Sequence, residues 1–409
     1  MDGTTTFVIV GGGLAGAKAA ETLREEGFDG RVVLLSDEPE PPYERPPLSK
    51  GYLLGNDDRD TAFVHPAPWY GEHDIELRLG TRVTALDPGA HEVELDGGER
   101  LGYTKLLLAT GSEPRRLDLP GADLEDVRYL RNLPDSDHLR DVLDEGHRVA
   151  IIGGGWIGLE VAAAARTHGA DVTLIEIADL PLQAVLGDDI ARVFADLHRE
   201  HGVDLWLGTG VREIVGDNGR VVAVVTSDGD EIMADTVVVG IGIAPRTELA
   251  AAAGLTIENG VAVDAGFRTS DPDIYAAGDV AAIENPLVGT RVRVEHWANA
   301  LDGGPAAARS MLGKDVSWDK PPYFFTDQYD LGMEYTGHAP PGSYDDVVLR
   351  GDVPGRAFQA FWLSGGRPIA GMHVNLWDDG IGPIQELVKS GRTVDPARLA
   401  DPEVPLDEV

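Results

Sequence analysis

The strongest indication of the fold in this 409-residue chain is Phe7-Val8-Ile9-Val10-Gly11-Gly12-Gly13-Leu14-Ala15-Gly16. An apolar β-branched run ends in three glycines, an alanine-rich helical stretch follows to Arg24, and a second β-type run ends at Asp37. At this spacing the glycines make a tight turn, admit a pyrophosphate and let helix pack on strand, while the acid binds ribose hydroxyls. We therefore predict a dinucleotide site whose residues are Gly11, Gly13, Gly16 and Asp37.

The same design occurs a second time, from Val149 to Glu176. A β-type run to Ile152 leads into Gly153-Gly154-Gly155-Trp156-Ile157-Gly158, a helical stretch follows to Arg166, and the next β-type run ends at the acid. One glycine motif is a weak signal, but two copies with strand, helix and acid in register are a strong one. Two sites imply two dinucleotides, most simply a bound flavin and a diffusing nicotinamide. The second set of site residues is Gly153, Gly155, Gly158 and Glu176.

Three further apolar runs end in glycine and are suited to returning the chain beside a cofactor. They are 106–111, 237–242 and 274–278, the last followed by Asp279. From about Trp318 the pattern of residue types changes. An aromatic, strand-like stretch from Tyr323 to Gln328 is followed by alternating segments and by an amphipathic helix near Ile384 to Lys389. This predicts an α+β domain at the C-terminal end. The Pro-rich acidic stretch from Val394 onward is expected to fray towards its end.

Composition excludes several classes of protein. The net charge of −36 argues against nucleic acid and anionic membranes as partners. No apolar run approaches the ~18 residues of a membrane span, and no basic leader precedes the first strand, so we expect a cytoplasmic protein. The absence of cysteine excludes a disulfide, a thiolate metal site and dithiol catalysis. We therefore expect no bound metal.

The chain resembles the FAD-dependent NAD(P)H:ferredoxin reductases of bacterial oxygenase systems, relatives of rubredoxin reductase and apoptosis-inducing factor. The most specific match is Pro42-Tyr43-Glu44-Arg45-Pro46-Pro47-Leu48-Ser49-Lys50, shortly after the first acid. The other matching motifs are Ala109-Thr110-Gly111, Gly278-Asp279, Glu295-His296-Trp297-Ala298-Asn299-Ala300 and Thr326-Asp327-Gln328-Tyr329-Asp330-Leu331. The resemblance covers nearly the whole chain.

The resemblance implies an α/β fold with two Rossmann-like dinucleotide-binding domains of the glutathione-reductase type and an α+β C-terminal domain. The implied FAD-binding domain is discontinuous, from 1–115 and 243–318, with an NAD-binding domain at 116–242 between its parts. The implied C-terminal domain, 319–409, covers the flavin.

Individual site residues also follow from the resemblance. The first glycines cradle the FAD pyrophosphate, and Asp37 holds the adenosine ribose. The backbone of Val83 meets the adenine, Arg45 lies along the cofactor, and Asp279 binds the ribityl chain. Lys50 lies near flavin N5 and Glu160 beside the nicotinamide, as the two catalytic residues. The remaining expected cofactor contacts are Thr110, Gly111, Trp297 and Gly242.

Elementary chemistry agrees with these roles but leaves alternatives open. An ammonium at Lys50 would stabilise the negative charge that a hydride leaves on a flavin, yet a lysine in a Pro-rich loop can also be a solvated surface residue. Glu160 lies one turn into a helix, where an acid is favourable for dipole reasons alone. His296 is a weaker candidate, because hydride transfer needs no proton relay in its first step. Phe325 stands where several such reductases carry Trp, which leaves any partner-facing role of that position open.

The implied activity is transfer of hydride from NADH to FAD and of single electrons to a small iron-sulfur ferredoxin or rubredoxin-like acceptor that serves an oxygenase. The alternatives are a diaphorase or oxidase acting on quinones or O₂, and an NADH-responsive binding protein like apoptosis-inducing factor. The sequence leaves the oligomeric state open between a monomer and a homodimer. Because ferredoxins are usually acidic, we expect a docking face that is either locally basic or apolar. The candidates for a basic face are Arg291, Arg293, Arg309, Lys314 and Lys320, which can equally be scattered solvated charges.

Overall fold

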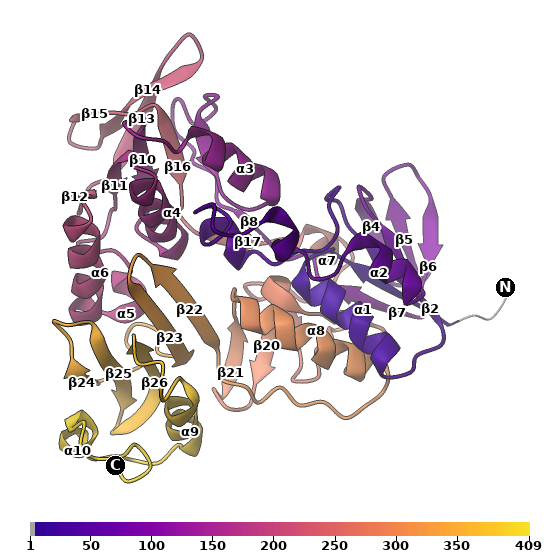
Figure 1. Ribbon diagram of the computed structural model, residues 1–409. Coiled ribbons are helices and arrows are strands. Elements are labelled where there is room, and N and C mark those ends of the chain that lie inside the picture. Colours follow the sequence, from indigo (N-terminus) through magenta and orange to yellow (C-terminus); the bar gives the residue numbers. More distant parts are fainter. Residues whose placement is uncertain (1–4) are drawn as a thin grey trace. The chain divides into compact units, whose positions relative to one another are not determined.

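The computed structural model describes residues 5–409, which form two compact units (Figure 1). Each unit is assembled from separate segments of the chain. Unit 1 comprises the chain as far as Arg45, Arg59–Glu113 and Ala244–Pro322, and unit 2 comprises Pro46–Asp58, Pro114–Ile243 and Tyr323–Val409.

A five-stranded parallel sheet forms the centre of unit 1, in the order β19-β7-β1-β2-β3. Strand β1 pairs with β2 on one side and β7 on the other, so that Val8 lies between Val33 and Leu106. Helix α1 (Leu14–Glu25) connects β1 to β2, as a parallel pair requires. The strands are β1 (Thr6–Val10), β2 (Arg31–Leu35), β3 (Ile75–Arg78), β7 (Lys105–Leu108) and β19 (Ile274–Ala276).

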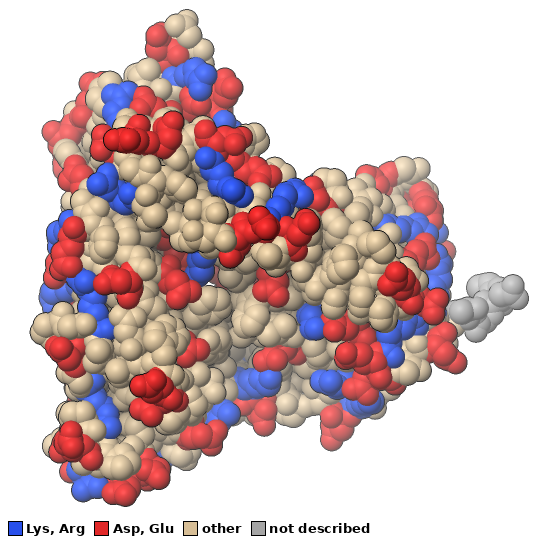
Figure 2. Space-filling model, viewed as in Figure 1, with Lys and Arg blue, Asp and Glu red and all other residues tan. Residues whose placement is uncertain are grey.

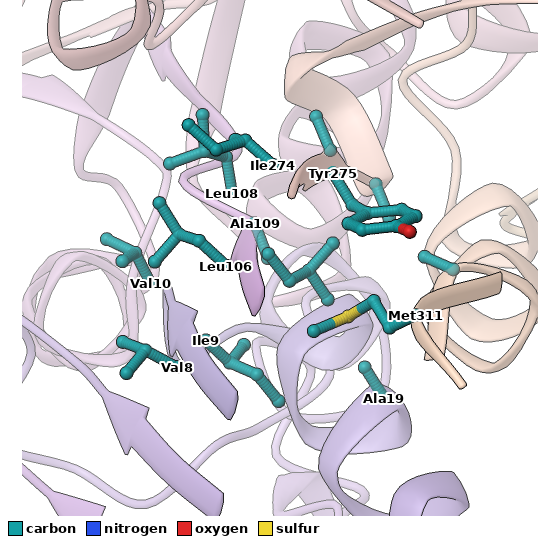
Figure 3. Close-up of a cluster of buried hydrophobic side chains, with 14 of the residues drawn as sticks. Val8, Ile9, Val10, Ala19, Leu106, Leu108, Ala109, Ile274, Tyr275 and Met311 are labelled. Carbon is teal, nitrogen blue, oxygen red and sulfur yellow. The ribbon is translucent and has the colours of Figure 1, made fainter. Parts of the chain in front are cut away.

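Buried side chains from these strands and from two helices make the core of unit 1. Figure 3 shows the strand residues Ile9, Leu106 and Tyr275 with Ala19 of α1 and Met311 of α8 (Trp297–Met311). Helices α1 and α8 lie side by side (Figure 1). A Cβ at Gly304 would lie 2.2 Å from the carbonyl oxygen of Ala15, so only glycine permits this close helix contact.

Smaller elements complete unit 1. Two three-stranded sheets have the orders β4-β5-β6 and β18-β20-β21, and unit 1 also contains several short helices. Their bounds are β4 (Val83–Asp87), β5 (Glu92–Leu95), β6 (Arg100–Gly102), β18 (Val261–Val263), β20 (Ala281–Asn285), β21 (Thr290–Arg293), α2 (Ala67–Glu72), α7 (Glu248–Ala252), η2 (Arg59–Ala62) and η3 (Gly278–Val280).

Unit 2 contains a second five-stranded parallel sheet, in the order β12-β11-β10-β16-β9. Its β10, α4 and β11 repeat the arrangement of β1, α1 and β2. The bounds are β9 (Val127–Tyr129), β10 (Arg148–Ile152), β11 (Asp171–Ile175), β12 (Asp204–Trp206), β16 (Thr236–Val239) and α4 (Trp156–Thr167).

The C-terminal part of unit 2 is an antiparallel sheet in the order β22-β23-β26-β25-β24. Its buried residues share a hydrophobic core with the parallel sheet of unit 2, for example Met372 with Leu174. The strands and helices of this part are β22 (Tyr323–Gln328), β23 (Leu331–Gly337), β24 (Asp346–Asp352), β25 (Ala357–Ser364), β26 (Arg367–Val374), α9 (Gly382–Ser390) and α10 (Pro396–Ala400).

The expectation that the last residues fray is wrong. The guanidinium of Arg350 donates to the carbonyl oxygens of Leu399, Asp401, Pro402 and Val404. A second arginine, Arg392, donates to the carbonyl oxygens of Leu406 and Asp407. The tail lacks a long helix or strand, but these side chains satisfy its backbone and hold it on the sheet.

The remaining elements of unit 2 are an antiparallel sheet in the order β13-β14-β15 and several helices. Their bounds are β13 (Val211–Asp217), β14 (Arg220–Thr226), β15 (Glu231–Met233), η1 (Pro46–Ser49), α3 (Leu133–Val142), α5 (Gln183–Leu186) and α6 (Asp188–Glu200). Strands β8 (Ser112–Pro114) and β17 (Ile243–Pro245) pair with each other and contain two of the points where the chain passes from one unit to the other.

The α/β fold class with two parallel sheets and a C-terminal α+β part is confirmed. The compact units differ in two respects from the expected domain ranges. Residues 323–409 lie in the same unit as the segment expected to bind NAD. The segment Pro46–Asp58 lies in unit 2, because Leu53 is buried in its core and Ser136 Oγ donates to the carbonyl oxygen of Leu48 at 2.9 Å. The division into FAD, NAD and C-terminal domains stays a prediction.

Candidate functional site

The first glycine turn in unit 1 has the backbone of a phosphate cradle. Gly11 has φ +124°, and a Cβ there would lie 2.1 Å from the carbonyl oxygen of Ala109. A Cβ on Gly16 would lie 2.1 Å from the carbonyl oxygen of Gly11, so helix and turn touch. Gly13 has open space at its Cβ position and begins α1 with no side-chain cap. The first amide groups of α1 are thus left for an anion, and the site fits the pyrophosphate of FAD.

The acid of this turn, Asp37, lies between two arginines. Its Oδ2 is 3.3 Å from Arg82 Nη2 and 3.3 Å from Arg246 Nη1. The amide of Thr81 donates to the carbonyl oxygen of Ser36 at 2.7 Å, which brings the start of β4, including Val83, towards the acid. These arginines escaped the sequence analysis, since neither is near Asp37 in the chain. They fix the carboxylate that we expect to bind the ribose.

Several other predicted FAD residues of unit 1 are tied together by hydrogen bonds. Asp279 Oδ2 accepts from Ser112 Oγ at 2.7 Å. Thr110 Oγ1 donates to the carbonyl oxygen of Arg246 at 2.9 Å, and the carbonyl oxygen of Gly111, whose φ is +67°, accepts from the amide of Arg246. The structure therefore links the strand end at 108–112 to the segment that also fixes Asp37.

The proline-rich motif and the Glu-His-Trp motif also meet within unit 1. Arg45 Nη2 donates to Glu38 Oε1 at 2.8 Å, and Trp297 Nε1 donates to Glu44 Oε2 at 2.9 Å. A glutamate thus orients each of these two predicted cofactor contacts, Arg45 and Trp297.

Burial lowers the pKa of His296 to about 4, with Asp279 opposing the shift. His296 is therefore neutral at physiological pH, which agrees with the weak case for it as an acid.

The second glycine turn repeats the cradle in unit 2. Gly153 has φ +107°, and its Cβ would lie 2.5 Å from the carbonyl oxygen of Gly240. A Cβ at Gly158 would lie 2.1 Å from the carbonyl oxygen of Gly153, whereas one at Gly155 would be 3.8 Å from its nearest atom. Gly155 begins α4 without a side-chain cap, and Gly242, with φ +98°, follows the neighbouring strand β16. The residues present fit the pyrophosphate of a nicotinamide dinucleotide.

The acid of the second turn, Glu176, is held by backbone groups. Its Oε2 accepts from the amide of Gly154 at 2.5 Å, and its Oε1 accepts from the amide of Ala178 at 2.8 Å. Among residues 5–409 no Lys or Arg forms an ion pair with this carboxylate. An uncompensated acid at this place accepts ribose hydroxyls and disfavours a 2′-phosphate.

The two predicted catalytic residues form an ion pair inside unit 2. Lys50 Nζ lies 2.7 Å from Glu160 Oε1, and the Glu160 side chain is 3% exposed. Two hydroxyl groups also donate to this carboxylate, Ser49 Oγ at 2.5 Å and Thr326 Oγ1 at 2.6 Å. The ring of Phe325 lies 5.2 Å from Lys50 Nζ. Lys50 is therefore a partly buried, paired cation and not a solvated surface lysine.

Ser49 and Thr326 were missed as site residues, although both stand in motifs that the sequence analysis quoted. Their signal was adjacency: Ser49 precedes Lys50, and Thr326 opens the Thr-Asp-Gln motif. A hydroxyl group can be assigned to the site only once the buried carboxylate to which it donates a hydrogen bond is known.

The structure does not support a basic docking face built from the five candidate cations, because each is paired with an acid of unit 1. Both Arg309 and Lys314 contact Glu26. The other three pairs are Arg291 with Glu258, Arg293 with Glu295 and Lys320 with Asp302. On the face seen in Figure 2, basic side chains lie scattered among acidic ones.

No helix within residues 5–409 is both long and apolar enough to cross a membrane. Within the same residues, no cluster of three or more His, Asp or Glu side chains is placed to hold a metal ion.

Two family models match the chain. The model described as pyridine nucleotide-disulphide oxidoreductase matches residues 5–304, and the model described as reductase C-terminal matches residues 323–409. Despite the first description, the sequence contains no cysteine. The match therefore concerns the cofactor-binding fold and not a dithiol.

Named relatives cover nearly the full length. The ferredoxin–NAD(+) reductase component of the anthranilate 1,2-dioxygenase system of Burkholderia cepacia is 44% identical over 401 residues, 98% of each protein. Rhodocoxin reductase of Rhodococcus erythropolis is 39% identical over 401 residues, which cover 98% of this chain and 93% of that protein. The solved structure of the covalent putidaredoxin reductase–putidaredoxin complex matches with a TM-score of 0.95 and 36% identity, over 99% of this chain and 97% of that one. The chain therefore belongs to the pyridine nucleotide-disulphide oxidoreductase family, among the FAD- and NAD(P)H-dependent ferredoxin reductases.

Proposed function

We propose that this protein accepts hydride from NADH and delivers single electrons to a small iron-sulfur ferredoxin that feeds an oxygenase. FAD, when bound, supplies the conversion of a two-electron donor into one-electron steps. The observation that carries the proposal is the pair of complete dinucleotide turns, one in each unit, with differently held acids. The names of the relatives support ferredoxin as the acceptor class.

The chain's own residues would divide the work as follows. The turn at Gly11–Gly16 binds the FAD pyrophosphate, Asp37 binds its ribose, and Asp279 binds the ribityl chain. The turn at Gly153–Gly158 and Glu176 bind the nicotinamide dinucleotide. Arg45, Val83 and Trp297 make the remaining FAD contacts.

Lys50 supplies positive charge for the hydride step. Its ammonium is held by Glu160 at 2.7 Å and is only 15% exposed, so water screens it weakly. Preorganised charge of this kind stabilises the negative charge that develops when hydride arrives. Glu160 fixes the ammonium and, one turn into α4, lies beside the place where the nicotinamide would bind.

NADH is the proposed donor in preference to NADPH, because no Lys or Arg within residues 5–409 forms an ion pair with Glu176 and the acid would repel a 2′-phosphate. No Lys or Arg occurs from Ile177 through Ala191. We also place the protein in the cytoplasm, where a pool of NADH can sustain turnover.

The test is stopped-flow reduction of the purified holoprotein by NADH, followed by cytochrome c reduction with a panel of acidic ferredoxins. The proposal expects at least one ferredoxin to raise cytochrome reduction tenfold or more over the reductase alone. Full turnover with quinones or O₂ and no response to any ferredoxin would instead identify a diaphorase or oxidase. Slow reoxidation with an NADH-induced change of mass would identify a binding protein.

A further inference from the structure

A series of hydrogen-bonded, buried side chains leads away from the Lys50 and Glu160 pair within unit 2, and we call it the hydrogen-bond chain. Thr326 Oγ1 donates to Glu160 Oε1 at 2.6 Å, and Gln328 Nε2 donates to Thr326 Oγ1 at 3.1 Å. The chain ends at His198 of α6, whose Nε2 lies 2.9 Å from Gln328 Oε1. Thr326 and Gln328 lie on the same side of β22, as alternate residues of a strand do, and both are buried.

The chemistry of each group gives this chain a direction. An amide oxygen only accepts, so His198 must carry its proton on Nε2. The amide nitrogen of Gln328 occupies a lone pair of the Thr326 hydroxyl, which leaves the hydroxyl proton for Glu160. His198 Nδ1 is then a buried acceptor, and it has no partner in the described chain.

Burial keeps the far end of the chain uncharged. His198 is fully buried, which lowers its pKa to about 4, and the nearby His201 contributes in the same direction. Tyr329 packs edge-on to the His198 ring at 5.3 Å and stacks on His201 at 3.7 Å. At neutral pH the chain therefore brings no second positive charge towards Lys50.

The carboxylate of Glu160 depends on this arrangement because Lys50 and Thr326 both donate to the same oxygen. A hydroxyl hydrogen can rotate away from its acceptor. A buried carboxylate that loses a hydrogen-bond donor in this way destabilises the folded protein. Gln328 removes that freedom by occupying the acceptor side of the hydroxyl.

We propose that His198, Gln328 and Thr326 are positioning residues that orient the Glu160 carboxylate and, through it, the Lys50 ammonium for the hydride step. The proposal rests on the proposed function only in its use of that step. The direction of the chain can be tested without turnover.

The first experiment measures the tautomer of His198 by NMR in holoprotein labelled with ¹⁵N-histidine. The proposal expects a proton on Nε2 that exchanges slowly with water, together with an unprotonated Nδ1, at pH 7. Gln328→Leu should shift the Nε2 resonance and speed the exchange of its proton, because the acceptor is lost. A proton on Nδ1 would mean that the Gln328 amide is turned around, and the proposal would be overturned.

The second experiment measures flavin reduction by NADH in stopped flow, with FAD content and thermal stability as checks on folding. Thr326→Val removes the hydroxyl at nearly constant volume and should slow reduction about tenfold, and Gln328→Leu should slow it about threefold. Thr326→Ser keeps the hydroxyl and should restore the rate to within about twofold. Gln359→Leu is the matched control, since Gln359 is also a buried glutamine of the C-terminal sheet but does not belong to the hydrogen-bond chain.

The outcomes separate the inference from the proposed function. Wild-type reduction rates in both Thr326→Val and Gln328→Leu would overturn the positioning role, whatever the ferredoxin panel shows. Slower reduction in these variants together with no ferredoxin response in the wild type would support the positioning role and refute the acceptor. If Thr326→Val fails to fold, Gln328→Leu and the histidine tautomer decide.

Discussion

In unit 1 the glycine turn lies beside an acid held by two arginines, whereas in unit 2 the equivalent turn lies beside an acid held by backbone amides. The turns themselves match: the amide of Gly11 donates to the carbonyl oxygen of Leu35, and that of Gly153 to the carbonyl oxygen of Ile175. The next residue is Ser36 in one copy and Glu176 in the other, so Asp37 stands one position later than its counterpart. One backbone design thus carries two different electrostatic settings.

The helices that follow the turns differ in charge as well. Two residues beyond the last glycine, α1 has Lys18 and α4 has Glu160. Lys18 pairs within its own helix, with Glu21 at 2.5 Å, whereas Glu160 pairs with Lys50 from a distant segment. Only the second pair thus brings a lysine from outside its own motif, and a glycine motif alone does not reveal this.

The largest expected effect comes from breaking the first turn. Gly16→Ala should yield protein without FAD and lower the free energy of unfolding by about 1 to 3 kcal/mol, since the new Cβ would overlap a backbone oxygen. Gly13→Ala is the control, because its Cβ meets nothing within 4 Å. It should leave the apoprotein's stability within about 0.5 kcal/mol while weakening FAD binding. Flavin absorbance and calorimetry measure both, and equal destabilisation by the two variants would contradict the distinction.

Lys50→Met should retain FAD but slow its reduction by NADH about 10²-fold, the effect expected for removing one electrostatic stabiliser. Lys18→Met, at the helix position that Glu160 occupies in the second copy, should leave the rate unchanged. Stopped-flow absorbance gives both rates. A wild-type rate in Lys50→Met would show that its pairing with Glu160 is only structural.

Glu176→Arg should reverse the charge beside the second glycine turn. We expect the wild type to prefer NADH by about 10² in kcat/KM, and the variant to narrow that ratio to tenfold or less. Asp37→Asn changes the acid of the other turn and should not alter the ratio. Steady-state kinetics with NADH and NADPH test this prediction, and equal use of both cofactors by the wild type would refute the site assignment.

The smallest expected effect concerns the starts of β1 and β10. The amide of Thr6 donates to Thr104 Oγ1, whereas the corresponding amide of Arg148 and its guanidinium both donate to Asp235. Arg148, the largest cause, lowers the pKa of Asp235 from 3.8 to about 2. The stabilisation is therefore complete above about pH 4 and is lost as the pH falls towards 2.

Asp235→Asn tests this ion pair. Both side chains are more than one third exposed, so the variant should cost less than about 1 kcal/mol at pH 7. The difference from wild type should shrink below pH 4, as urea unfolding at several pH values would show. A difference that grows on acidification would contradict the assigned sign.

The sequence was sufficient for the elements that form both glycine turns, but not for the smaller antiparallel sheets or for the partners of the side chains. Strand β22 begins at Tyr323 and ends at Gln328, as its aromatic composition predicts, and both glycine turns lie where their spacing places them. The arginines at Asp37 come from positions 45 and 209 residues away. Such contacts depend on tertiary packing, which local patterns do not encode.

The C-terminal tail, from Val394 onward, also depends on contacts that local sequence patterns do not show. Its Pro-rich, acidic composition is typical of a loose end, and the strands and helices around it gave no sign of the two arginines that hold it. An arginine that binds main-chain oxygens leaves no periodic pattern in the segment it binds.

This manner of attachment has a consequence for protein engineering. Every amino acid offers the same carbonyl oxygen, so Arg350 and Arg392 hold the tail by its path and not by its side chains. Substitutions at the exposed positions between Ala400 and Asp407 should therefore be tolerated, whereas Leu399 and Leu406 pack on the core and should not be changed. Inserting or deleting a single residue would move every oxygen out of register. A peptide tag fused after Val409 should leave the hydrogen bonds from Arg350 and Arg392 to the tail intact.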